Sequence, residues 1–173
     1  MLRIRDIGPD PVADLLVRFD LSLKLVAEDL PIPGTFWGEP EAGVIGKSVY
    51  ARLDTPVHSV FHEAGHIVCM TAERRETLHR DAGGDDLEES AVCYLQVLLG
   101  DCLEGVGKDQ LMRDMDSWGY SFRLGNTAAW FASDADDARC WLVDHELISR
   151  DGVPTFRLRD DGASPPSMSD RAT

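Results

Sequence analysis

Residues 57–66 read Val57-His58-Ser59-Val60-Phe61-His62-Glu63-Ala64-Gly65-His66. This segment contains the pattern HExxH, and the apolar residues in and after it recur at the three- and four-residue spacing of an α-helix. Residues four apart on a helix lie one above the other, so His62 and His66 can direct two imidazoles at one ion. The sequence therefore predicts a helix from Val57 to about Glu76 that carries two histidine ligands of a metal.

Glu63 lies beside both histidines in this segment. A bound metal ion lowers the pKa of a coordinated water toward about 7, and a neighbouring carboxylate can take its proton while the water attacks a polarised carbonyl. We therefore expect a metal ion at this site, with Glu63 able to take a proton from its bound water.

The third ligand must come from outside this segment. A longer pattern, HExxHxxGxxH, is excluded because Cys69 and Ala72 stand where it requires glycine and histidine. A second strongly apolar helix is predicted from Leu87 to about Leu103, with Asp85 or Asp86 as its N-cap. Acidic residues at the start of this helix are the candidates for the third ligand.

Glu88 and Glu89 open this second helix. By helical phase, Glu88 shares a face with apolar residues, whereas Glu89 points with Cys93 and Gln96. A carboxylate on an apolar, core-facing stripe is costly to bury unless a metal compensates its charge, which favours Glu88 as the ligand. The alternatives are that Glu88 is only a first-turn acid favoured by the helix dipole, or that Glu89, Asp85 or Asp86 is the ligand.

The two segments together resemble the zincin metallopeptidases of the gluzincin type, in which a glutamate on a later helix completes the HExxH site. Residues 88–99, EESAVCYLQVLL, are similar to the E-x-x-A-x-x-F-A-x-x-L-L pattern of small bacterial metallopeptidase domains that cleave phage or stress regulators. The resemblance covers about Val57 to Leu99. It implies zinc bound by His62, His66 and Glu88, with Glu63 as the base.

The resemblance also implies two structural features around the site. Many relatives have Asp or Asn one residue after the alanine, where it orients a ligand histidine, and that position is Val92 here. The family fold places a short sheet before the HExxH helix, with an edge strand that can pair with an extended substrate, and Val44 to Arg52 would supply it.

Three further residues are candidates for supporting roles. His58 lies one turn before His62, where it would act as a ligand or behind one, or would simply be a partly exposed first-turn residue. Tyr120 and His145 are candidates to donate a hydrogen bond to the oxyanion, since zincins usually supply such a donor from a later segment.

The rest of the chain predicts a mainly helical α+β domain with a small β-sheet ahead of the HExxH helix. A helix is expected from Pro11 to about Leu30, and residues 44–51 suit a β-hairpin. Further helices are expected from Asp109 to Trp118 and from about Asp134 to Ile148. Residues 1–159 are expected to form a single domain, and the Pro- and Ser-rich residues 160–173 a disordered tail.

The composition of the chain indicates which partners and which cellular compartment to expect. The chain of 173 residues has a net charge of −14, which repels a phosphate backbone, so nucleic acid is not expected as a partner. No apolar run is long enough for a membrane helix and no signal peptide is evident, so a cytoplasmic protein is expected. The four cysteines are expected as buried thiols. The function expected is hydrolysis of peptide bonds in a protein or peptide, the alternatives being another zinc hydrolase such as an amidase, and a non-enzymatic zinc-binding scaffold.

Overall fold

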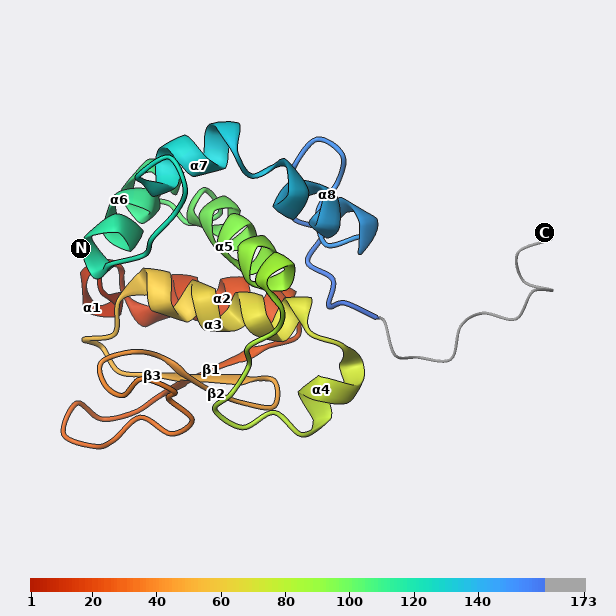
Figure 1. Ribbon diagram of the computed structural model, residues 1–173. Coiled ribbons are helices and arrows are strands. Elements are labelled where there is room, and N and C mark those ends of the chain that lie inside the picture. Colours follow the sequence, from red (N-terminus) through yellow and green to blue (C-terminus); the bar gives the residue numbers. More distant parts are fainter. Residues whose placement is uncertain (161–173) are drawn as a thin grey trace.

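The computed structural model describes residues 1–160, which contain eight helices and one three-stranded sheet. The expected disordered tail therefore lies, apart from Asp160, outside the described residues. The mainly helical α+β class, with a small sheet ahead of the HExxH helix, is confirmed. Figure 1 shows three layers: the sheet, two helices lying across it, and the later helices on top. No helix in residues 1–160 has the length and apolar character needed to cross a bilayer.

The sheet has the strand order β1-β3-β2 and consists of β1 (Ser22–Leu25), β2 (Gly43–Ile45) and β3 (Ser48–Ala51). β2 and β3 form the predicted hairpin, and the turn between them places Gly46 at a φ of 58°, which glycine adopts without strain. β1 runs parallel to β3. The helix expected over Pro11–Leu30 is therefore wrong in its second half.

The N-terminal segment consists of α1 (Ile4–Ile7) and α2 (Pro9–Arg18). α2 ends at Arg18, and Asp20 takes a φ of 60°, which turns the chain into β1. Leu21 and Leu23 fit both the spacing of a helix and the alternation of a strand, so periodicity alone did not separate the two structures.

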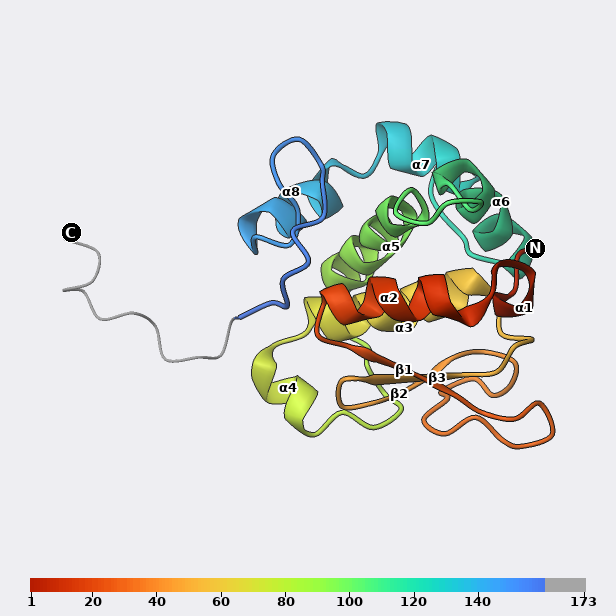
Figure 2. The ribbon, with the colours of Figure 1, turned by 180° about the vertical axis from the view of Figure 1, so that it is seen from behind.

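The HExxH helix is α3 (Val57–Cys69), and it lies beside α2 across the sheet (Figures 1 and 2). It ends earlier than predicted because Met70 is extended, and Thr71 then caps the short helix α4 (Ala72–Glu76) by accepting a hydrogen bond from the backbone N–H of Arg74. Every residue of α3 except His62 and Glu63 is buried. The two half-buried residues of the central helix therefore belong to the HExxH pattern.

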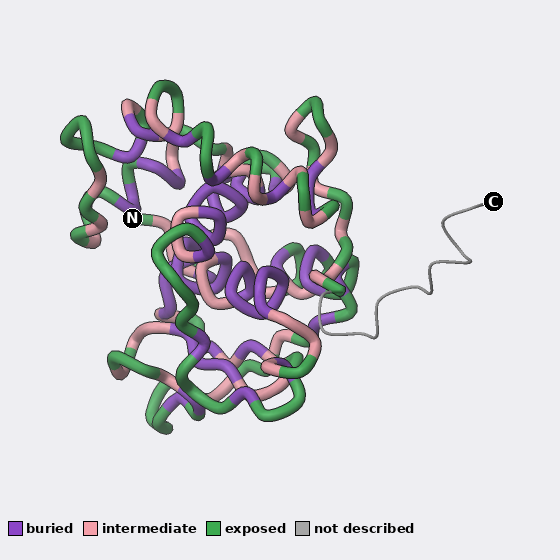
Figure 3. The backbone as a smooth tube through the Cα atoms, turned by 45° about the vertical axis from the view of Figure 1, so that its right-hand side comes forward, coloured by how far each residue is buried: buried purple, intermediate pink, exposed green. Residues whose placement is uncertain are grey.

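α5 (Asp86–Gly100) packs on α3, and both helices form the buried centre of the molecule in Figure 3. Asp85 caps α5 as predicted, since its carboxylate accepts a hydrogen bond from the backbone N–H of Glu88. The two helices approach closely at Gly65, where an added Cβ would lie 3.0 Å from Val92 Cγ1. A side chain at position 65 would push α5 away from α3.

The remaining helices cover α5 and bring one further segment to the site. They are α6 (Lys108–Trp118), α7 (Thr127–Ser133) and α8 (Asp136–Asp144). The helix expected from about Asp134 to Ile148 is the shorter α8, and the sequence did not predict α7. α6 ends at Gly119, whose φ of 111° reverses the chain direction and places Tyr120 beside α3.

All four cysteines are free thiols. Cys69 and Cys93 are buried as expected, whereas Cys102 is half-buried and Cys140 is exposed. The expectation of four buried thiols is thus wrong for the last two.

Candidate metal centre

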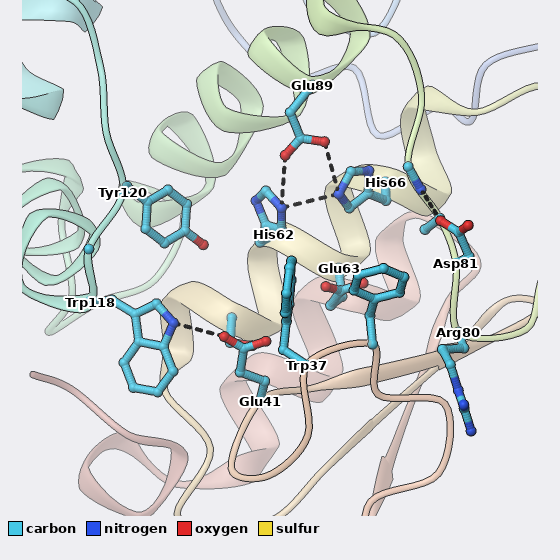
Figure 4. Close-up of a pocket in the computed structure, with 15 residues that line it drawn as sticks. Trp37, Glu41, His62, Glu63, His66, Arg80, Asp81, Glu89, Trp118 and Tyr120 are labelled. Atoms are coloured by element: carbon cyan, nitrogen blue, oxygen red, sulfur yellow. Dashed lines mark hydrogen bonds and ion pairs between the residues drawn. The ribbon is translucent and has the colours of Figure 1, made fainter.

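His62, His66 and Glu89 bring three ligand atoms together between α3 and α5 (Figure 4). His62 Nε2 lies 3.1 Å from His66 Nε2 and 3.1 Å from Glu89 Oε1, and His66 Nε2 lies 3.4 Å from Glu89 Oε2. In tetrahedral coordination with bond lengths of about 2.0–2.1 Å, zinc spaces its ligand atoms ~3.3–3.4 Å apart. The two imidazoles and the carboxylate therefore fit a single metal ion in both chemistry and spacing.

Glu88, the residue expected as third ligand, is not part of this group. Its carboxylate accepts two hydrogen bonds from Arg74 Nη1, at 3.0 and 2.9 Å, and lies 3.6 Å from Arg159 Nη1. Glu88 is only 4% exposed, so these guanidinium groups supply the compensating charge that the metal was expected to supply. The placement of Glu88 beside the two histidines is therefore corrected, and Glu89, one of the alternatives, lies there instead.

The helix phase was misjudged because α5 is buried on nearly all sides. The apolar stripe that begins at Glu88 includes Val92, which does pack on Gly65, but Val92 lies one helical turn from both Glu88 and Glu89, so this contact does not distinguish the two carboxylates. The face toward α3 also carries Glu89, Cys93 and Gln96, three and four residues apart along the helix. A polar stripe on an otherwise apolar helix was the signal that could have identified the metal-binding face from the sequence.

Glu63 lies next to the cluster at the wall of a cavity of about 520 Å³ (Figure 4). Burial raises the pKa of Glu63 to about 7, more than the nearby His62 lowers it. A carboxyl group that titrates near neutral pH is suited to take up and release a proton. The position expected for a catalytic base is therefore occupied by a group of suitable basicity.

The histidines of the cluster differ in their protonation. Burial lowers the pKa of His66 to about 4, so this imidazole is neutral at pH 7. Burial also opposes charge on His62, but electrostatic interaction with the Tyr120 side chain and hydrogen bonds with Cys93 and Glu89 raise its pKa well above the usual value. A proton on His62 Nε2 and a metal ion would compete for the same position between the three side chains.

Two of the supporting candidates lie close to the cluster. His58 is 1% exposed, and its Nδ1 lies 3.3 Å from the Tyr120 hydroxyl, so the partly exposed alternative is wrong. Burial raises the pKa of Tyr120 to about 12, so its hydroxyl keeps its proton at neutral pH and can donate it in a hydrogen bond. Tyr120 lines the cavity, whereas His58 lies behind His62 and is not among the three ligand atoms.

His145 is not at the site. It follows α8, its Nδ1 lies 2.8 Å from the backbone oxygen of Trp141, and it lines a different pocket, with Arg18 and Phe156. The expectation that it donates to the oxyanion is corrected, because α8 packs on the side of α5 that faces away from the HExxH residues.

The mouth of the cavity is formed by residues that sequence reasoning did not single out. Phe36 and Trp37, 53% and 79% exposed, stand edge to face on the loop between β1 and β2. On the opposite wall, Trp118 Nε1 donates a hydrogen bond of 2.8 Å to Glu41 Oε1. The cavity is thus lined by aromatic side chains and by carboxylates, among them Glu41, Glu63 and Glu89.

The strand edge beside the cavity already has partners. Val44 in β2 donates its N–H to Gly34 and accepts from the N–H of Arg80, and Gly46 donates to Leu78. The expected substrate-pairing edge over residues 44–52 is therefore occupied by the chain itself along β2.

Neither a scan against protein-family models nor searches of curated proteins and of solved structures returned a match for this chain.

Proposed function

We propose that this chain is a zinc-dependent metallopeptidase, and that Glu63 is its catalytic base. The observation that carries the proposal is the convergence of three side chains at the wall of an open cavity: His62 Nε2 and His66 Nε2 lie 3.1 Å apart, and they lie 3.1 and 3.4 Å from Glu89 Oε1 and Oε2, respectively. A zinc ion held there would act as a Lewis acid toward a peptide carbonyl and toward water.

Side chains of the protein would supply proton transfer, oxyanion stabilisation and substrate contacts. Glu63, whose pKa in the metal-free protein is about 7, would accept a proton from the attacking water and return it to the leaving amine. The Tyr120 hydroxyl lines the same cavity and is protonated at neutral pH, so it is suited to donate to the developing oxyanion. The aromatic mouth formed by Phe36 and Trp37 offers apolar contact area for substrate side chains.

The proposal is tested by metal analysis and peptide cleavage on the full chain. The purified protein is expected to hold about one zinc per chain and to cleave members of a peptide library, with activity lost in chelator and restored by zinc. Glu63→Gln should retain zinc and lose cleavage. Glu73→Gln, the same change at an exposed residue of α4, is the matched control and should behave as wild type. Absence of bound zinc in the wild type would contradict the proposal.

A second candidate is a non-enzymatic zinc-binding scaffold, and the occupied edge of β2 favours it. An extended peptide could pair with this strand only after displacing Gly34 or residues 78–80. A protein that binds zinc at His62, His66 and Glu89 but cleaves no peptide, and that loses much of its thermal stability on chelation, would support the scaffold.

A further inference from the structure

Gln96 is a fully buried amide in the middle of α5, with an exposed fraction of 0%, and the proposed chemistry gives it no role. A buried amide has four hydrogen-bonding positions to satisfy, and each one left unpaired destabilises the fold. Gln96 finds its partners on both sides of the candidate metal centre. One side chain thereby connects α3 with the segment after α6.

The contacts fix which end of the amide is nitrogen. One terminal atom lies 2.8 Å from the backbone oxygen of His58, and a carbonyl oxygen can only accept a hydrogen bond. That atom is therefore Nε2, and the other, Oε1, faces His62 Nδ1 at 3.1 Å. Because Oε1 carries no hydrogen, His62 Nδ1 must be the donor.

This hydrogen bond determines which ring nitrogen of His62 is free to bind a metal ion. With the proton held on Nδ1, the lone pair of the neutral ring is on Nε2, the atom that faces His66 and Glu89. The second hydrogen of Gln96 Nε2 points to the Tyr120 oxygen at 3.2 Å. Since Tyr120 then accepts from Gln96, its own hydrogen is directed elsewhere, to His58 Nδ1 or into the cavity.

We propose that Gln96 is a positioning residue that holds His62 as the Nδ1–H tautomer and at the same time orients the Tyr120 hydroxyl. The inference rests on the proposed metal site and deepens it. Position 92, where the resemblance places an orienting Asp or Asn, holds Val92 packed against Gly65. Gln96, one helical turn further along the same face of α5, supplies the hydrogen bond instead.

The test compares Gln96→Leu with Gln110→Leu. Gln110 lies on α6 and bonds to Asp114, outside the cavity, so it controls for loss of a glutamine as such. Gln96→Leu is expected to bind Zn²⁺ and Co²⁺ about 10- to 100-fold more weakly than wild type, as removal of such hydrogen bonds to ligand histidines typically does. Gln96→Glu, which can still accept from Nδ1–H, should bind both ions several-fold more tightly than Gln96→Leu. Gln110→Leu should match wild type.

Nitrogen-15 NMR of the histidine rings supplies a readout that loss of packing alone would not move. In wild type, the proton on His62 Nδ1 is expected to be hydrogen-bonded to Gln96 Oε1 and protected from exchange with solvent, with and without metal, and this protection should be lost in Gln96→Leu. A wild-type His62 whose Nδ1 carries no proton would overturn the inference, even if Gln96→Leu did not fold. Unchanged metal affinity in a folded Gln96→Leu would overturn it as well.

These outcomes separate the inference from the proposed function. If wild type binds zinc and His62→Ala does not, the site stands, and a normal Gln96→Leu refutes only the role of Gln96. If wild type binds no zinc, the metal site fails, while the wild-type NMR measurement still decides whether His62 Nδ1 donates a hydrogen bond to Gln96 Oε1.

Discussion

The carboxylates of Glu88 and Glu89, neighbours in the sequence, have opposite partners in the structure. Glu89 lies within 3.1–3.4 Å of His62 and His66, whereas Glu88 accepts two hydrogen bonds from Arg74. The rotation of about 100° per residue along a helix separates the two side chains. One of them completes the candidate metal centre, and the other anchors a loop.

Exchanging each carboxylate for an amide separates these two roles. Glu89→Gln should lose most of its zinc, because a neutral amide is a poor replacement for a carboxylate ligand. Glu88→Gln should retain zinc, because its side chain lies on Arg74 and Arg159. Metal content after dialysis measures both. Loss of zinc from Glu88→Gln alone would show that the geometry of α5 is not as described.

Glu88→Gln should instead weaken the fold. Arg74 links Glu88 to the backbone oxygens of Ala82 and Gly83, which line the cavity. Removing the buried charge from this ion pair should lower the free energy of unfolding by about 1–3 kcal/mol, less than for a fully buried pair because Arg74 is 36% exposed. Urea unfolding of the zinc-loaded proteins measures the change, with Glu73→Gln as the control. An unchanged midpoint would contradict a structural role for Glu88.

Glu63→Gln should abolish activity without removing the metal. Only the proton acceptor is lost, so cleavage of any peptide substrate should fall at least ~10²-fold while zinc content stays as in wild type. Turnover under saturating zinc is the measurement. Equal turnover in variant and wild type would exclude Glu63 as the base.

The same variant should be more stable than wild type at high pH when both are metal-free. Burial raises the pKa of folded Glu63 to about 7, whereas the unfolded group titrates near 4.5. The folded state therefore holds more protons between these values, and wild type loses stability as pH rises from about 4.5 to about 7. Thermal unfolding measured in chelator should give Glu63→Gln a higher melting temperature than wild type at pH 8, but not at pH 4. A variant advantage that does not change with pH would contradict the raised pKa.

His58 should make the metal-free protein sensitive to acid. Burial lowers the pKa of His58 to about 4, so below about 6.5 the unfolded chain takes up a proton that the folded chain does not. This stability is present above pH 6.5 and is lost as pH falls through about 4. His58→Gln cannot be protonated, so its loss of stability between pH 7 and pH 4 should be smaller by about 1–3 kcal/mol. Urea midpoints at both pH values measure it, and equal losses would contradict the prediction.

The sequence alone was sufficient to predict those features that depend on local spacing. His62, Glu63 and His66 fall on one helix because four residues make about one helical turn, and Asp85 caps α5 because a short acidic side chain can reach the free amide of Glu88. The β2–β3 hairpin likewise follows from short apolar segments around Gly46. All of these features depend on residues that are close together in the sequence.

Tertiary packing decided the features that depend on which helix face meets which neighbour. α5 is buried nearly all round, so an apolar stripe could not show that Glu89 rather than Glu88 faces α3, and the guanidinium of Arg74 that compensates Glu88 comes from a separate helix. Leu23 lies in a strand because β3 offers it a partner. Gln96 reaches His62, the His58 backbone and Tyr120 only after α3, α5 and the segment behind α6 have packed together, since those contacts span up to 38 residues of sequence.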